Sequence, residues 1–118
     1  MSDARRAFEE SLELHQRLKD RPNFATTLEH GAGLLAAEGN IVDGFRVAAA
    51  TAAFRRSFGM TRPAHDQRVL DAWLTPARDA LGAEADRLWA EGEALSLEAA
   101  ITLATSGLRE GAGNEARA

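Results

Sequence analysis

The stretch IVDGFRVAAATAAFRRSF, residues 41–58, predicts a helix that is apolar on two sides, and the fold is interpreted from it outward. Its apolar residues recur at three- and four-residue steps in two stripes, which are Ile41, Phe45, Ala48 and Ala52 on one side and Val47, Ala50, Phe54 and Phe58 on the other. A surface helix has one such stripe, whereas a helix that is apolar around most of its circumference is buried. We therefore predict that this is the central helix of an all-α domain, with Asn40 as its N-cap and Gly59 as its terminator.

The same spacing predicts five further helices around the central one, so the fold is expected to be all-α with about six helices. Their ranges are residues 3–19, 22–39, 61–81, 83–94 and 97–106. Ser96 is placed to cap the last of these helices. Pro76 lies inside the 61–81 segment and removes a backbone donor, so either Thr75 caps a second half-helix or the helix kinks there.

Two glycines interrupt the predicted helix that begins at Pro22. Gly31 and Gly33 each weaken a helix by roughly 1 kcal/mol relative to alanine. A helix that accepts this loss usually has a neighbour that approaches its backbone closely. We therefore expect either close packing or a small-ligand pocket beneath these two glycines.

The composition is that of a single globular domain: 118 residues, 45% hydrophobic, with a net charge of −4 and no cysteine. The absence of cysteine excludes disulfides, thiolate nucleophiles and cysteine-ligated metals. No uncharged run approaches the length of a membrane span and no secretory pattern begins the chain, so we expect a cytoplasmic protein. Residues 41–78 carry six arginines and three aspartates, too small an excess for direct nucleic-acid binding.

An internal match suggests a helical repeat. The segment DARRAF, residues 3–8, aligns with DGFRVA, residues 43–48, at an offset of 40 residues, and helix pairs that recur at such spacing indicate a solenoid. We therefore expect a tetratricopeptide-like stack of antiparallel helical hairpins over residues 1–107. Residues 108–118 have no apolar periodicity and are expected to form a disordered tail.

Three segments resemble known proteins. DARRAFEESL, residues 3–12, is similar to the second helix of a tetratricopeptide repeat. The residues that are similar to the pattern of the next repeat are Leu28, Ala32, Leu35, Gly39, Asn40 and Gly44. The segment WAEGEALSLEAA, residues 89–100, resembles the C-terminal end of the helical-repeat region in MalT-like and LuxR-type bacterial transcriptional regulators, which have a signal-transduction ATPase core. The resemblance implies a scaffold or sensor that binds an effector or a protein partner and controls that core.

The candidate contact residues lie on one face of the second predicted helix and are Thr26, Glu29, His30 and Gly33. In helical repeats this face often lines the concave surface that holds a partner, and the alternative is a solvated face. Trp73 and Trp89 are expected to be anchors of the core or of an interface, because large aromatic rings dominate the energetics of both.

The sequence contains no readable catalytic or metal-binding set. The histidines, His15, His30 and His65, are far apart without an i, i+4 pair, and no nucleophile accompanies His65. Arg55 and Arg56 are interpreted as arginines placed favourably near a helix C-terminus rather than as an anion site. We therefore expect a protein that is not an enzyme and that needs no cofactor.

Two functions remain open at this point. The first is a non-catalytic module that binds a protein partner or an effector within a transcriptional regulator and associates as a homodimer, since the end of a solenoid exposes an apolar face. The second is a small-ligand sensor with a pocket between its helices. Neither function involves direct contact with nucleic acid or with a membrane.

Overall fold

The computed structural model describes the backbone of residues 2–117 and the side chains of these residues except 2–5, 15, 18 and 108–117. The elements in chain order are α1 (Ser2–Leu18), α2 (Arg21–Ala37), α3 (Ile41–Ser57), α4 (Ala64–Leu81), the short 3-10 helix η1 (Gly82–Glu84), α5 (Ala85–Glu93) and α6 (Leu97–Arg117). No strand occurs between residues 2 and 117, which confirms the all-α prediction.

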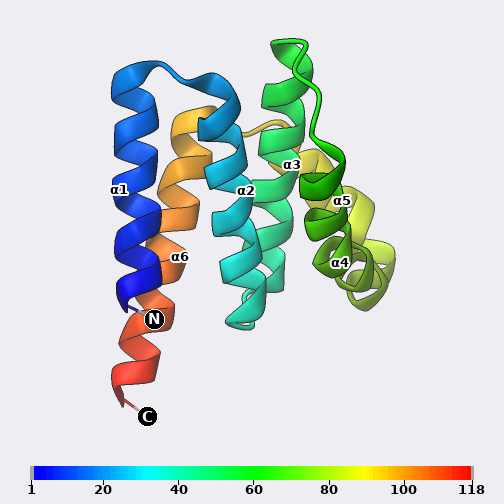
Figure 1. The fold of residues 1–118 in the computed structure, drawn as a ribbon. Coiled ribbons are helices and arrows are strands. Elements are labelled where there is room, and N and C mark those ends of the chain that lie inside the picture. Colours follow the sequence, from blue (N-terminus) through cyan, green and yellow to red (C-terminus); the bar gives the residue numbers. More distant parts are fainter. Residues whose placement is uncertain (1, 118) are drawn as a thin grey trace.

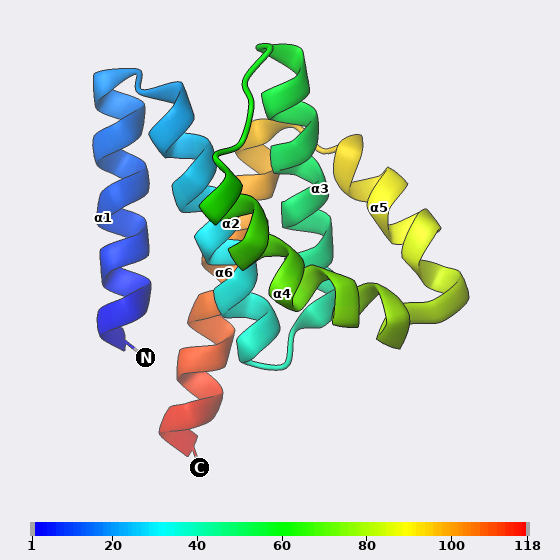
Figure 2. The ribbon, with the colours of Figure 1, turned by 45° about the vertical axis from the view of Figure 1, so that its right-hand side comes forward.

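The first three helices form an antiparallel row that is covered on both sides. α1, α2 and α3 run up, down and up in Figure 1, and α6 returns along the row against all three of them. In Figure 2, α4 crosses in front of α2 and α3, whereas α6 lies behind α2. α5 packs against α3 at the far end of the molecule.

The central helix is α3, as its two apolar stripes predicted. Phe45 and Val47 are completely buried although they lie on different stripes. Ala49 and Thr51, further along the helix, are also completely buried. α3 contacts α2, α4, α5 and α6, so there is a neighbour on almost every side of it. Its N-cap is Asn40, whose side-chain oxygen accepts a hydrogen bond from the backbone N–H of Asp43 at 3.4 Å.

Two of the helix ends show how the chain turns. Gly39 has a φ of +93°, as expected for a glycine that ends α2 in a left-handed conformation. Lys19 ends α1 with a φ of +56°, and it is the one non-glycine residue with positive φ in the described part of the chain. This turn could not be predicted from the residue type, because glycine is the usual residue in this conformation.

The close approaches predicted at the glycines of α2 are present, and the side chains that make them come from two different helices. A Cβ placed on Gly31 would overlap the ring of Phe8 on α1, and one on Gly33 would lie 3.3 Å from Nε1 of Trp73 on α4. The space beneath Gly31 is therefore filled by Phe8, which leaves only Gly33 beside an open pocket. Gly92 also permits a close approach, since its Cβ would lie 2.6 Å from the Cβ of Ala49 on α3.

The second half of the chain differs in part from the predicted elements. α4 continues as one helix through Pro76, without the break at Thr75 that was one of the two alternatives. The helix expected over residues 97–106 is α6, which is traced as helix to Arg117. The disordered tail expected over residues 108–118 stays a prediction, because side chains beyond Gly107 are not among those described.

Candidate functional site

A cleft between α2 and α4 gathers the candidate contact residues. Each helix lines it with one face at helical spacing, with Thr26, Glu29, His30, Gly33 and Leu34 from α2 and Asp66, Val69, Leu70 and Trp73 from α4. The cleft has a volume of about 400 Å³, which lies within the range of roughly 300–1,000 Å³ that is usual for small-molecule sites.

All four contact residues predicted on α2 line this cleft, so the structure brings them together. Trp73, predicted as an anchor, faces them from α4, and its indole ring lies next to Gly33. Trp89 lies elsewhere, on α5: its ring packs edge-on against Phe45 of α3 at a centroid distance of 5.2 Å. Trp89 is therefore an anchor of the core and not part of the cleft.

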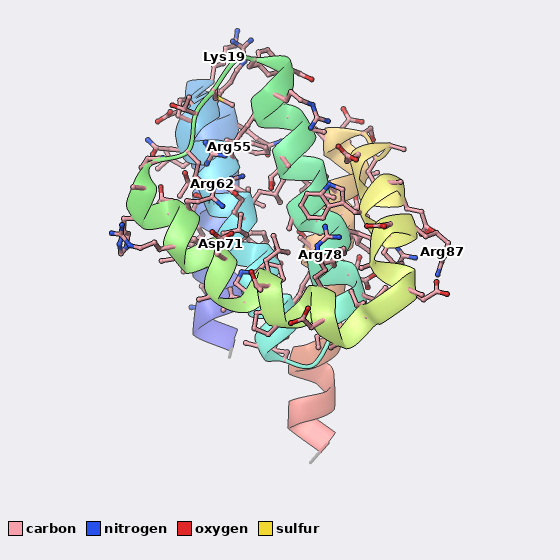
Figure 3. The ribbon with its side chains drawn as sticks, turned by 90° about the vertical axis from the view of Figure 1, so that its right-hand side faces the viewer. Lys19, Arg55, Arg62, Asp71, Arg78 and Arg87 are labelled. Carbon is pink, nitrogen blue, oxygen red and sulfur yellow. The ribbon has the colours of Figure 1, made fainter. Side chains whose placement is uncertain are left out.

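A buried ion cluster adjoins the part of the cleft that Thr26 and Glu29 line. Glu29 accepts hydrogen bonds through Oε1 from Nε and Nη2 of Arg55 at 3.0 and 2.6 Å, and through Oε2 from Nε of Arg62 at 2.7 Å. Arg55 Nη2 also donates to Oγ1 of Thr26 at 3.1 Å. Figure 3 shows Arg55 of α3 close to Arg62, which lies in the segment that leads from α3 to α4. Both carboxylate oxygens are occupied, so Glu29 positions the cleft and is not free to contact a ligand.

The ion cluster extends onto α4 through Arg62. Arg62 Nη1 donates to Oε1 of Gln67 at 2.7 Å, and Gln67 Nε2 donates to Oδ1 of Asp71 at 2.9 Å. The network therefore joins α2, α3 and the first turns of α4 through charged hydrogen bonds. Because such bonds are short and directional, they fix the angle at which α4 crosses α2 and so set the width of the cleft.

Arg55 lies in the last turn of α3, as interpreted from the sequence, but the sequence analysis missed its burial and its partner. The residue is 4% exposed and pairs with a carboxylate on another helix, 26 residues away in the sequence. A signal was present: Glu29 lies four residues after Ala25 and three before Ala32, on the buried face of α2. A charge on such a face is costly unless it is paired, so it predicts a buried partner of opposite charge.

The chemistry of the cleft is that of a binding site. Its floor is formed by Leu34, Leu70 and Trp73, and its open rim carries the polar side chains of His30 and Asp66. The indole nitrogen of Trp73 lies next to Gly33, and no hydrogen bond of its N–H is found among the described residues. An apolar floor with a few convergent polar groups is typical of small-molecule and side-chain pockets.

A second hollow continues the cleft on the other side of Trp73. It has a volume of about 380 Å³ and is lined by Gly33, Ala36, Ala37, Ile41, Ala72, Trp73, Pro76, Ala77 and Ala80. Trp73 and Gly33 border both hollows, because α2 and α4 touch at this point and diverge on either side of it. The Gly33–Trp73 contact thus divides one long groove into a half with polar groups and an apolar half.

Comparison with known proteins does not assign the chain to a family. No match to it was found among protein-family models, curated proteins or solved structures. Within the described residues, no helix combines the length and the apolar character that crossing a lipid bilayer requires. The same part of the chain holds no group of three or more side chains that is suited to bind a metal ion.

Proposed function

We propose that this protein is a non-catalytic module that binds a protein partner or an effector through the α2–α4 cleft. The observation that carries the proposal is the assembly of Thr26, His30 and Gly33 with Trp73 around one cleft of about 400 Å³. The first three residues lie on α2 and Trp73 lies on α4, 40 residues after Gly33. A cleft that joins them with an apolar floor and a polar rim fits recognition.

The proposal places the module in a bacterial transcriptional regulator of the MalT-like and LuxR type, where it would act in the cytoplasm and associate as a homodimer. The WAEGEALSLEAA segment, residues 89–100, supports this placement by its resemblance. Antiparallel hairpins also support a tetratricopeptide-like origin: α2 and α3 pack so closely that a Cβ on Gly44 would lie 2.7 Å from the carbonyl oxygen of Ala32. Such packing is common between helices of repeat proteins.

A small-ligand sensor is the second candidate function. It is favoured by the size of the cleft and by the indole donor of Trp73, which could orient a small molecule. The two functions differ in how much of the ligand enters the cleft. A protein partner would insert one side chain, whereas a small effector would be enclosed as a whole. A small molecule alone would raise the melting temperature in the second case, because it binds only the native state.

The test uses a charge placed in the cleft. Val69 lines the cleft and is 46% exposed, whereas Val42 on α3 is 37% exposed and does not line it. We expect Val69→Glu to abolish binding of a signal-transduction ATPase core from a regulator of this type, measured by isothermal titration. Val42→Glu is the matched control and should bind as the wild type does. Absence of binding by the wild-type chain, or equal loss in both variants, would contradict the proposal.

A further inference from the structure

We propose that a second site, at the end of the bundle where α1 turns into α2, binds small organic anions with an aromatic or aliphatic body. The site is a hollow of about 360 Å³ lined by Gln16, Lys19, Asp20, Arg21, Phe24, Phe54, Phe58 and Leu97. Lys19 marks its position at the top of the molecule in Figure 3. It shares no residue with the α2–α4 cleft, so it is independent of the function proposed above.

One side of this hollow is a series of aromatic rings that leads from the core to the surface. Phe24 meets Phe54 edge-on at a centroid distance of 6.1 Å, and Phe54 meets Phe58 in the same way at 5.0 Å. Phe24 is 4% exposed, whereas Phe58 is 48% exposed, the largest exposure among the large hydrophobic residues described. Exposed aromatic surface next to a hollow is suited to pack against an apolar ligand body.

The other side of the hollow is cationic. Lys19 and Arg21 both line it, and the guanidinium of Arg21 lies 4.3 Å from the centroid of the Phe58 ring. The carboxylate of Asp20 is engaged locally, since its oxygens accept hydrogen bonds from the side chain and backbone of Asn23 at 2.6 and 3.4 Å. Two cations beside an exposed ring complement a ligand that has an anionic head and an apolar body.

The charge at this site contrasts with the rest of the chain. The whole protein has a net charge of −4, yet Lys19 and Arg21 also line an adjoining hollow of about 280 Å³ together with Phe58 and Met60. The two cations therefore border both hollows, together with Asp20, and the three side chains carry a net charge of +1. An anion bound there would be attracted by local charge that the overall composition does not reveal.

The backbone at Lys19 provides a way to separate binding from stability. Its φ of +56° is unfavourable for a residue with a side chain and is natural for glycine. A lysine at this position thus lowers stability relative to glycine, which is understandable if its ammonium group has a role. Lys19→Gly removes that ammonium group and at the same time relieves the unfavourable backbone conformation.

The experiment titrates the full chain with 3-phenylpropanoate and follows amide chemical shifts by NMR. We expect saturable shifts around residues 19–21 and at Phe58, and little effect of the neutral amide of the same compound. Arg21→Gln and Lys19→Gly should each weaken binding about tenfold, which corresponds to one lost charged contact. Lys19→Gly should meanwhile raise the melting temperature, which excludes unfolding as the cause.

The matched control is Arg68→Gln, which removes the same charge from an exposed position on α4. We expect this variant to bind 3-phenylpropanoate as the wild type does. The proposal is overturned if the neutral amide binds equally well, or if Arg68→Gln weakens binding as much as Arg21→Gln. It is also overturned if no saturable shift appears up to the solubility limit of the probe, or if the shifts lie around another surface.

Discussion

Glu29 is the centre of the buried ion cluster. Two arginines converge on its carboxylate, and all three groups are nearly excluded from water, with side-chain exposures of 7% for Glu29, 5% for Arg55 and 15% for Arg62. Burial of these charges is tolerated only because they are paired and hydrogen-bonded. Removal of the single carboxylate would leave two guanidinium groups without their counter-charge.

We expect Glu29→Ala to lower the free energy of unfolding by about 3–5 kcal/mol, the usual loss when one member of a buried ion pair is removed. Urea unfolding followed by circular dichroism measures this loss. Glu93→Ala is the matched control, because Glu93 pairs with Arg56 at the surface, where that arginine is 67% exposed. Its effect should be below about 1 kcal/mol. Equal effects of the two substitutions would show that the buried cluster contributes no more to the free energy of unfolding than a surface ion pair does.

At the scale of elements, α5 is fixed to α3 by close packing and by a surface ion cluster. Gly92 allows α5 to approach the backbone of Arg46, and the side chain of Arg46 donates to Oε1 of Glu91 through Nη2 at 2.8 Å. Arg87 donates to the other oxygen of Glu91 at 2.6 Å. The hydrogen bond from Arg46 is the main cause that lowers the pKa of Glu91 below its ordinary value of 4.5, and the charges of Arg46 and Arg87 act in the same direction.

This lowered pKa predicts the direction of a pH effect on α5. Because the folded protein favours ionised Glu91, the carboxylate stabilises the fold above its ordinary pKa of 4.5 and loses this effect as the pH falls through the lower folded value. Glu91→Gln should therefore lower the melting temperature at neutral pH, and the difference from wild type should vanish in acid. Thermal scans from neutral to acidic pH measure it, with exposed Glu13→Gln as the control. A difference in melting temperature that grows in acid would contradict the lowered pKa of Glu91.

At the scale of the whole molecule, the last helix closes the bundle over the first. The Cα radius of gyration is 13.5 Å, close to the value of about 13 Å expected for a compact domain of some 100 residues. α6 contacts α1, α2 and α3, and Ala100 and Ala104 on it are completely buried in the main core. In an open stack of repeats each unit would contact only its neighbours, whereas α6 shares the main core with α1, α2 and α3.

We expect Ala104→Glu to release α6, because it places an unpaired charge in the core that α6 shares with α2 and α3. The radius of gyration measured by small-angle X-ray scattering should rise, and thermal unfolding should become less cooperative. Thr102→Glu, at an exposed position on the same helix, should leave both unchanged. An Ala104→Glu variant as compact and cooperative as the wild type would show that α6 is not needed for closure.

Much of the helical structure and half of the candidate site could be predicted from residues alone. The two apolar stripes of residues 41–58 identified the central helix, and Asn40 and Gly39 marked the turn before it. Helical spacing also placed Thr26, Glu29, His30 and Gly33 on one face of α2. These features depend on neighbours within a turn or two of helix, where sequence spacing translates directly into position.

Other features arise only where helices meet. The opposite wall of the cleft, from Asp66 to Trp73, depends on the angle at which α4 crosses α2, and the pairing of Glu29 with Arg55 joins residues 26 positions apart. The return of α6 across α1 is likewise a contact between the two ends of the chain. The helices and the faces they bury follow from the sequence alone, because local periodicity sets both. Which faces meet follows only from the folded molecule, because many pairings of similar apolar stripes are possible and side-chain packing selects among them.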